Sequence, residues 1–162
     1  MMDFADLYQR YARDIHRFAL FLCGNHALAE DLTAETFARA FAVNDDLRVD
    51  TVKAYLLAIT RNLYRDLRRR EGRLVPLEGT PEGADPAAKP DVTAEGRLRL
   101  EAVLSAIQRL PDRDREALVL AVDRDLSYVR VAAILGCSVP AIKVRVHRAR
   151  VRLKALLEEE QS

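Results

Sequence analysis

The sequence predicts an all-helical protein in which two small domains are joined by a flexible linker. On either side of residues 72–92, apolar residues recur every three or four positions, and no segment shows the alternation expected of a strand. Residues 72–92 lack this periodicity and hold four of the six prolines and three of the six glycines. Because proline has no backbone donor and glycine leaves the backbone free, we expect a linker here, between domains at 1–71 and 93–162.

Three helices are expected in the first domain. The first ends near Gly24, since glycine commonly stops a helix, the second ends near Asn44, and the third covers about 51–70. Helices that each carry an apolar stripe pack together as a small bundle. The positions assigned to the three stripes are Leu7, Tyr11, Ile15, Phe18 and Leu22; then Leu28, Leu32, Phe37 and Phe41; then Leu56, Ile59, Leu63 and Leu67.

The second domain is expected to begin with a helix near 98–110 and a second helix that starts at Pro111 and ends around Val122. Proline suits the first turn because its missing N–H has no partner there, and the acids that follow suit the positive end of the helix dipole.

A helix-turn-helix is predicted at the end of this domain. Ser127 caps a short helix over 128–135, and Gly136 supplies the left-handed residue that closes it. Ser138 then caps a long helix, with Pro140 in its first turn. A short helix, a glycine turn and a second helix form a common DNA-reading unit. The buried side of the short helix is assigned to Val131, Ala132 and Leu135.

The long helix carries a surface suited to a DNA major groove. At about 100° per residue, one face gathers the apolar residues Ile142, Val146, Ala149 and Leu153. The opposite face is an apolar strip bordered by lysines and arginines. From this face Arg148 can reach guanine, while Lys143 and Arg145 hold mainly phosphates. The residues expected to contact duplex DNA are Ser138, Pro140, Ala141, Lys143, Val144, Arg145, His147, Arg148 and Arg152.

The charge distribution supports a nucleic-acid partner, although the net charge is only +1. Residues 1–47 hold eight acids against four arginines, whereas residues 143–154 hold six bases and no acid. A second basic cluster over residues 61–70 is interrupted only by Asp66. Local fields decide binding, so two basic stripes on a near-neutral chain are meaningful.

No metal, cofactor or catalytic site is predicted. Cys23 and His26 have the spacing of a metal-binding pair, but with three histidines in all, further ligands are lacking. The sequence shows no glycine-rich phosphate loop and no acid pair beside a nucleophile, so an enzyme has little support. The acidic N-terminus and the absence of a long apolar run predict a cytoplasmic protein without membrane insertion.

The sequence resembles the bacterial RNA polymerase sigma factors of the extracytoplasmic-function (ECF) group over nearly its whole length. Either domain alone would only be suggestive, but both domains in this order make the resemblance specific. The matching segments are AEDLTAETF at 29–37, YLLAITRN at 55–62, LPDRDREA at 110–117, LSY at 126–128, GCS at 136–138 and IKVRVHRAR at 142–150.

The resemblance implies a dissociable subunit of RNA polymerase rather than an enzyme. The helix at about 28–43 would dock on the coiled coil of the largest subunit of core polymerase. An anti-sigma factor is expected as a further partner, and no cofactor is expected. The residues assigned to polymerase binding are Glu30, Asp31, Thr33, Glu35, Thr36 and Arg39.

The resemblance also implies two contacts with promoter DNA. The second domain would read the minus-thirty-five element as duplex, and the first would melt the minus-ten element and capture an extruded base of the non-template strand. The linker would thread toward the polymerase active-site channel, and its acidity fits a path normally taken by nucleic acid. The residues assigned to the minus-ten element are Leu47, Arg61, Asn62, Arg65, Arg68 and Arg69.

Four features depart from the family pattern. Leu47 stands where an aromatic residue is frequent, which weakens stacking on a flipped base. Tyr55 replaces a tryptophan, Val129 and Arg130 replace an acidic pair, and Val144 replaces a small polar residue. We expect these changes to alter promoter preference rather than to abolish the role.

A stand-alone transcriptional regulator is the alternative interpretation. Its N-terminal bundle would serve dimerisation or sensing, but such regulators rarely carry a second basic helix ending in Arg68, Arg69 and Arg70. Binding to core polymerase discriminates between the two.

Overall fold

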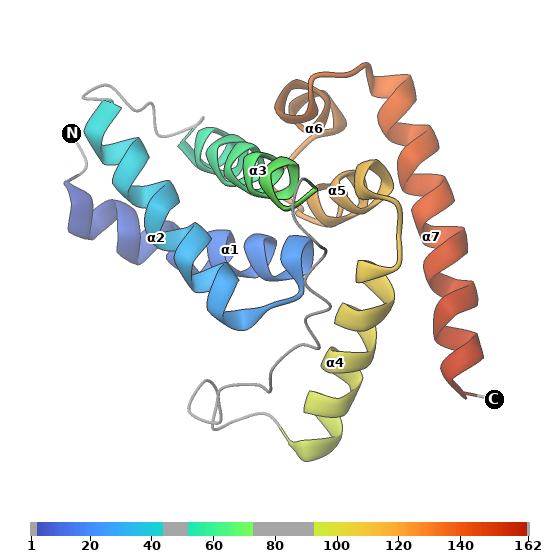
Figure 1. Ribbon diagram of the computed structural model, residues 1–162. Helices are drawn as coiled ribbons and strands as arrows, with labels where there is room; N and C mark the ends of the chain where they lie inside the picture. The colour runs from blue at the N-terminus through green and yellow to red at the C-terminus, as the bar shows by residue number, and fades with distance from the viewer. Residues whose placement is uncertain (1–2, 44–51, 73–92, 162) are drawn as a thin grey trace. The chain divides into compact units, whose positions relative to one another are not determined.

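The structure is a computed structural model that describes residues 3–43, 52–72 and 93–161. The described residues form helices and no strand, which confirms the predicted all-helical class. The chain divides into two compact units, Met1–Glu82 (unit 1) and Gly83–Ser162 (unit 2). Most of the expected linker lies outside the described residues. In chain order, the helices are α1 Phe4–Cys23, α2 His26–Val43, α3 Val52–Glu71, α4 Ala94–Gln108, α5 Asp112–Ala121, α6 Tyr128–Leu135 and α7 Val139–Gln161 (Figure 1).

Unit 1 is a bundle in which α1, α2 and α3 pack against one another. Gly24 ends α1 with φ +69°, and its N–H bonds the carbonyl of Leu20 at 2.7 Å. The Asn25 side chain then accepts a hydrogen bond from the N–H of Leu28 at 2.9 Å and so caps α2. The stripe predicted for α1 is confirmed, since its five residues are all buried.

Two stripe predictions for unit 1 need correction. Phe41 of α2 is 55% exposed, and on α3 only Leu56 of the four predicted residues is buried. Apolar residues cover more than half of the circumference of α3, so their spacing does not select which side faces inward. Tertiary contacts select the side that includes Thr60, while Ile59, Leu63 and Leu67 are half-buried. The buried residues of α3 are Val52, Leu56, Leu57, Thr60 and Tyr64.

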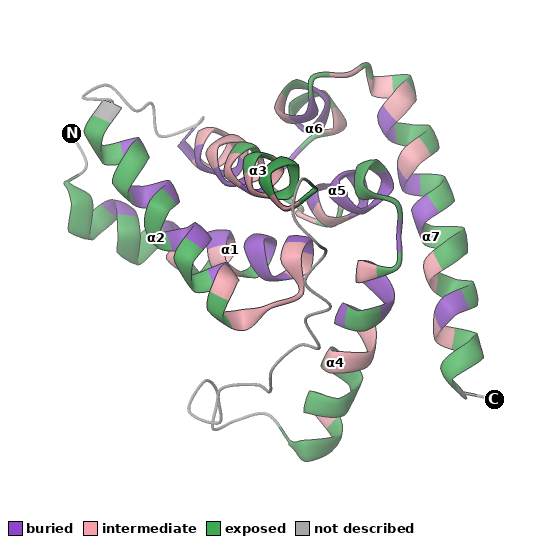
Figure 2. Cartoon of the chain, viewed as in Figure 1, coloured by how far each residue is buried: buried purple, intermediate pink, exposed green. Residues whose placement is uncertain are grey.

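Unit 2 is built around α7, which packs against α4, α5 and α6. The first helix starts earlier than predicted, at Ala94, because the Thr93 hydroxyl caps it by accepting from the Gly96 N–H at 3.0 Å. The predicted bounds of α5 and α6 are confirmed. Figure 2 shows buried residues recurring along α7 between exposed ones, as expected for a helix with one packed face. Ile142, Val146 and Ala149 are buried as predicted, and Leu153 is half-buried.

The joint between α4 and α5 is held by a buried arginine. The side chain of Arg115 donates to three backbone carbonyls at the end of α4, those of Ile107 at 3.1 Å, Gln108 at 2.8 Å and Leu110 at 3.0 Å. The last carbonyls of a helix are short of partners within it, and Arg115 adds side-chain donors to those of Ile107 and Gln108 and to that of Leu110 just beyond the helix. Only 4% of Arg115 is exposed, which makes this joint part of the core of unit 2.

Candidate nucleic-acid interface

The turn between α6 and α7 has the geometry predicted for a helix-turn-helix. Gly136 ends α6 with φ +69° and ψ +38°, a left-handed conformation that glycine adopts without steric cost. The N–H groups of Gly136 and Cys137 both bond the carbonyl of Ala132. These bonds satisfy the end of α6 and aim the chain into the next helix within three residues.

The start of α7 is capped as predicted. The Ser138 hydroxyl accepts a hydrogen bond from the N–H of Ala141 at 3.2 Å. Pro140 lies in the first turn, where its missing N–H leaves no bond unmade. The cap therefore fixes where α7 begins and, with it, which side chains point outward.

The outward face of α7 is an apolar strip flanked by lysine and arginine side chains. Val144 is 53% and Val151 57% exposed, and each lies opposite the buried face in a helical projection. Arg150 and Lys154, which the site prediction omitted, are exposed as well. Of the nine residues predicted to contact duplex DNA, the structure exposes Ser138, Pro140, Lys143, Val144, His147, Arg148 and Arg152, and half-buries Ala141 and Arg145.

Two arginines of α7 are engaged within unit 2. Arg145 donates from Nη1 to Sγ of Cys137 at 3.4 Å, which ties α7 to the turn before it. Arg148 donates from Nη2 to Oδ1 of Asp114, in the first turn of α5, at 3.1 Å. The side chain of Arg148 stays 59% exposed, whereas that of Asp114 is 9% exposed.

Asp114 and Arg115 escaped the site prediction. In the sequence, the segment that holds them, LPDRDREA, indicates only a helix start and a family motif. No local pattern links Asp114 to a residue 34 positions later, so only the tertiary structure brings the two side chains together.

The basic side of α3 is partly exposed. Asn62, Arg68 and Arg69 are exposed, whereas Arg61 and Arg65 are half-buried. Arg68 stands over the ring of Tyr64, with 6.0 Å between its Cζ and the ring centroid, and Arg69 pairs with Asp66 at 3.3 Å. These contacts order the arginines at the end of α3. The remaining minus-ten residue, Leu47, lies outside the described residues.

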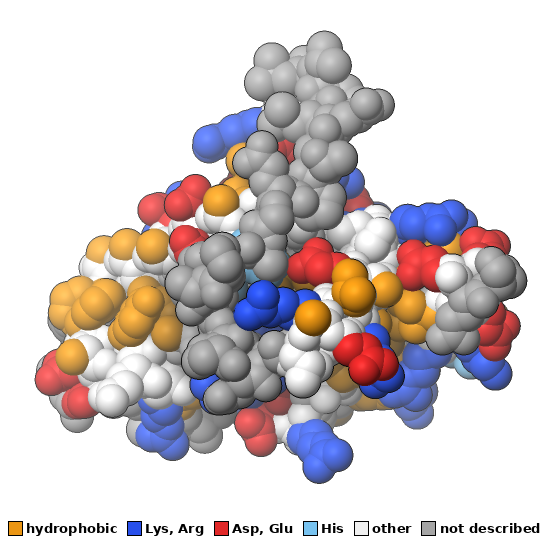
Figure 3. All heavy atoms as spheres, turned by 90° about the horizontal axis from the view of Figure 1, so that it is seen from below, with side chains coloured by type: hydrophobic (Ala, Val, Ile, Leu, Met, Phe, Trp, Pro, Cys, Tyr) orange, Lys and Arg blue, Asp and Glu red, His pale blue; other side chains and the backbone are white. Residues whose placement is uncertain are grey.

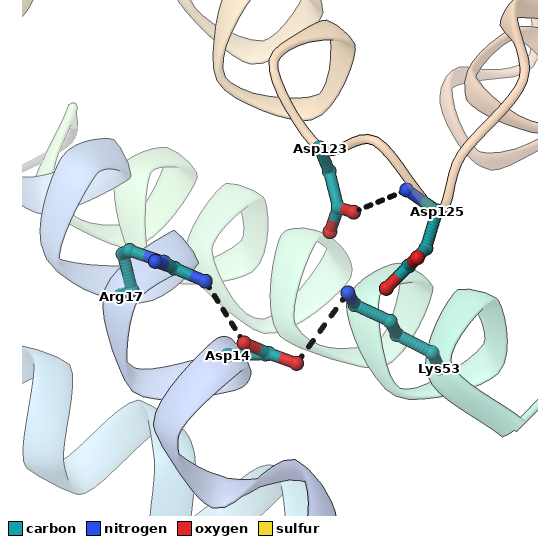
Figure 4. Close-up of polar contacts among 5 residues, drawn as sticks. All are labelled: Asp14, Arg17, Lys53, Asp123 and Asp125. Carbon is teal, nitrogen blue, oxygen red and sulfur yellow. Dashed lines mark hydrogen bonds and ion pairs between the residues drawn. The ribbon is translucent and has the colours of Figure 1, made fainter.

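The start of α3 is tied to α1 by one carboxylate (Figure 4). Oδ2 of Asp14 lies 3.4 Å from Nζ of Lys53, and its Oδ1 accepts from Nη2 of Arg17 at 2.9 Å. Lys53 is 15% exposed, so this ion pair is more sheltered than a surface pair. The same view shows Oδ1 of Asp123 accepting from the backbone N–H of Asp125 at 2.9 Å, in the turn between α5 and α6.

The residues predicted to bind polymerase divide into two sets on α2. Glu30, Asp31, Glu35 and Arg39 are exposed, and Oε1 of Glu35 accepts from Nε of Arg39 at 3.1 Å. Thr33 and Thr36 are instead buried, at 5% and 0% exposure, so their assignment to a surface contact is wrong for this structure. Residue type alone misleads here because a threonine hydroxyl can bond the carbonyl four residues earlier and so enter a core.

The hydroxyls of two buried threonines join α2 to α3. Oγ1 of Thr36 lies 2.9 Å from Oγ1 of Thr60, and both residues are 0% exposed. Each hydroxyl also lies within bonding distance of a carbonyl of its own helix, that of Leu32 or of Leu56. Two hydroxyl hydrogens serve three contacts, so only two of the contacts are hydrogen bonds at any moment.

An aromatic cluster lies exposed where α1 and α2 meet. The ring of Phe4 stacks on Tyr8 at 6.0 Å between centroids and meets Phe41 edge-on at 5.4 Å. The three residues are 42%, 46% and 55% exposed. Figure 3 shows hydrophobic side chains gathered on the side where α1 and α2 lie in Figure 1. A contiguous exposed apolar area of this kind favours a protein partner.

Within the described residues, no three His, Cys, Asp or Glu side chains come together as metal ligands. Cys23 and Cys137 are not joined in a disulfide bond. None of the helices in the described ranges combines the length with the apolar content that a bilayer crossing requires.

A capped helix-turn-helix with an exposed basic helix, attached to a second unit with its own basic helix, defines a helical DNA-binding protein of transcription. Comparison with known families makes this specific: residues 7–74 match the model for sigma-70 region 2, and residues 100–153 match the model for sigma-70 region 4. The chain belongs to the ECF RNA polymerase sigma factors, as its resemblance to them predicts.

The relatives support this assignment over the full length of the chain. The ECF RNA polymerase sigma factor SigE of Mycolicibacterium smegmatis is 35% identical over 100% of this chain, which spans 64% of that relative. SigM of Bacillus subtilis is 32% identical over 96% of this chain and 95% of the relative. The solved structure of sigma factor RpoE from Bartonella quintana, in complex with the anti-sigma factor NepR, is 32% identical with a TM-score of 0.77 and covers 98% of both chains.

Proposed function

We propose that this sigma factor binds core RNA polymerase through α2 and directs it to promoters that it reads with α7 and α3. The observation that carries the proposal is the outward face of α7. There an apolar strip is exposed among lysine and arginine side chains, on a capped helix-turn-helix. Exposed valines on a rigid helix gain little in water, whereas thymine methyl groups would cover them. The family membership supplies the polymerase as the partner.

On α7, we propose three kinds of DNA contact. Val144 contacts thymine methyls, and Lys143 and Arg152 hold phosphates on either side of it. Arg145 makes a smaller contribution than its charge suggests, because it is half-buried against the turn. Arg148 is the proposed reader of guanine.

On α3, we propose that Asn62 contacts an unpaired base and that neighbouring arginines hold the DNA backbone of the minus-ten element. Asn62 is exposed and offers both a donor and an acceptor. Arg65 and Arg69 lie beside it on the helix surface away from the buried side. Because Arg68 stands over Tyr64, its guanidinium is positioned at the edge of this surface.

On α2, the proposed polymerase contact uses Glu30, Asp31, Glu35 and Arg39, without the two buried threonines. Asp31 and Glu35 are four residues apart and therefore lie on one face of the helix. The exposed aromatic cluster is formed by Phe4 and Tyr8 of α1 and Phe41 of α2, and it supports a protein partner on these two helices. We also propose an anti-sigma partner, on the analogy of RpoE and NepR.

Transcription in vitro tests the proposal. The chain is added to core polymerase with a library of promoters, and sequence-specific run-off transcripts are expected. Replacing Asp31 and Glu35 by lysine should abolish capture of core polymerase, while the same change at the exposed Glu158 and Glu160 of α7 should leave capture intact. Tight, sequence-specific DNA binding by a chain that fails to capture core polymerase would establish the stand-alone regulator instead.

Lys143 gives a separate test of the DNA contact. Its replacement by alanine should weaken binding to all promoters alike and lower the slope of log affinity against log salt by about one. The exposed Arg99 of α4 offers a control with the same loss of charge. A changed promoter preference in the Lys143 variant would contradict a phosphate contact.

A further inference from the structure

The contact between Arg148 and Asp114 places a fixed acid beside an exposed arginine. Nη2 of Arg148 lies 3.1 Å from Oδ1 of Asp114, and the bond joins α7 to α5 within unit 2. The two ends differ in freedom, because the Asp114 side chain is 9% exposed and that of Arg148 is 59% exposed. The buried carboxylate therefore sets the position, and the exposed guanidinium follows it.

The position of Asp114 is fixed by its sequence neighbour. Arg115 bonds three carbonyls at the end of α4, and its Nη1 lies 3.5 Å from Oδ1 of Asp112. Arg115 is 4% exposed, and its contacts hold the first turn of α5 against α4. Asp114 is consequently anchored to the core of unit 2 rather than to a movable surface.

The bond to Asp114 leaves most of Arg148 available. A guanidinium carries five N–H donors in a rigid planar fork, so one bond fixes the direction of the others. The carboxylate also offsets the positive charge, which weakens the attraction of Arg148 to phosphates. A charge-compensated, oriented arginine is poorly suited to general phosphate binding and well suited to the two acceptors of a guanine edge.

We infer that Asp114 is a specificity-determining positioning residue, which orients Arg148 toward a base edge and restrains it from phosphates. The inference rests on the proposed contact of α7 with duplex DNA. It predicts an unusual outcome: removing an acid that does not touch DNA should raise non-specific affinity while lowering sequence preference. A purely structural role would lower both.

The experiment compares Asp114→Ala, Asp114→Asn and Arg148→Ala in the full chain. Non-specific affinity is measured on a duplex of alternating A and T, which offers no guanine. Sequence preference is measured by selection from a randomised duplex library with the chain bound to core polymerase. Amide hydrogen exchange of α4 and α5 reports whether each variant retains the fold.

The expected result for Asp114→Ala is tighter binding to the guanine-free duplex, a salt slope steeper by about one, and about tenfold weaker preference for guanine at one position. Asp114→Asn should bind that duplex equally tightly but recover part of the preference, since its amide oxygen still accepts from Arg148. Arg148→Ala should lose the preference, and adding Asp114→Ala to it should cost no more preference.

The control is Glu95→Ala, which removes an acid from an exposed pair with Arg99 on α4 at 2.9 Å. An equal rise in non-specific affinity in this variant would reduce the effect to net charge and overturn the inference. Retained guanine preference in Asp114→Ala, with preference lost in Arg148→Ala, would also overturn it while leaving the proposed function intact. If the wild-type chain selects no sequence at all, the proposed function itself fails.

Discussion

Unit 1 and unit 2 place different kinds of polar group in their interiors. Among the described residues, the buried polar side chains of unit 1 are Thr33, Thr36 and Thr60, whereas those of unit 2 are Asp114, Arg115 and Glu116. A hydroxyl enters a helical core at small cost because it can bond a carbonyl of its own helix. A charged group must find partners elsewhere in the fold, so its burial ties distant segments together.

This difference has a consequence for the two DNA-binding helices. In unit 1, α3 is linked to α2 by neutral contacts that can be exchanged for apolar packing. In unit 2, α7 is linked to the α4–α5 joint through the adjacent residues Asp114 and Arg115. Substitutions of buried polar groups should therefore cost far more in unit 2 than in unit 1.

The largest effect is expected for Arg115→Met. The change keeps the apolar stem but removes the three hydrogen bonds that Arg115 donates to carbonyls, and should lower the free energy of unfolding of unit 2 by about 3 kcal/mol. Amide hydrogen exchange in α4 and α5 measures this within the full chain. Arg109→Met is the control, since that side chain is 56% exposed and lies 3.9 Å from Glu159. Equal protection in both variants would show that burial of Arg115 does not stabilise the joint.

Next in size are two glycine substitutions at the same backbone conformation. Gly24 and Gly136 both have φ +69°, so alanine at either position should cost between about 1 and 2 kcal/mol through backbone strain. A Cβ at Gly136 would meet no atom within 4 Å, so steric overlap adds nothing there. Hydrogen exchange should place each loss in its own unit. A several-fold larger loss for Gly136→Ala would mean that the turn carries more than its dihedral strain.

The hydroxyl pair of unit 1 should give a smaller effect. Thr36→Val or Thr60→Val should each cost about 1 kcal/mol. Each change removes one hydroxyl and leaves the other with only the carbonyl of its own helix as a partner. The double variant should cost no more than one single variant, since apolar groups of the same shape then meet. Denaturant unfolding followed through exchange of α2 and α3 amides supplies the values. Additive costs would contradict the shared-hydrogen arrangement.

The smallest effect is expected for Asp14→Asn. Its carboxylate is 30% exposed, so loss of the pairs with Lys53 and Arg17 should cost about 0.5 kcal/mol. The cost should shrink further in strong salt, which screens charges near the surface. Thermal unfolding of the variant at low and high salt measures both. A large cost that does not depend on salt would contradict this prediction and would show that the pair behaves like the buried charges of unit 2.

The sequence by itself determined the helical class, the helix-turn-helix and the outward face of α7. These features depend on residues close together in the chain: Ser127 and Ser138 cap the helices that follow them, and Gly136 adopts the left-handed conformation that closes α6. The spacing of apolar residues along α7 then decides which lysine and arginine side chains face outward. Local chemistry suffices for each, because the interacting groups lie within one or two helical turns.

Only the tertiary structure decided which side of α3 is buried, and that Thr33 and Thr36 are interior while Phe41 is exposed. It alone joined Thr36 to Thr60 across 24 residues, and Asp114 to Arg148 across 34. Such choices depend on how helices distant in sequence meet, and the spacing within one helix carries no information about its partner. A helix with apolar residues around most of its surface can bury any of several sides, and the neighbouring helices select one.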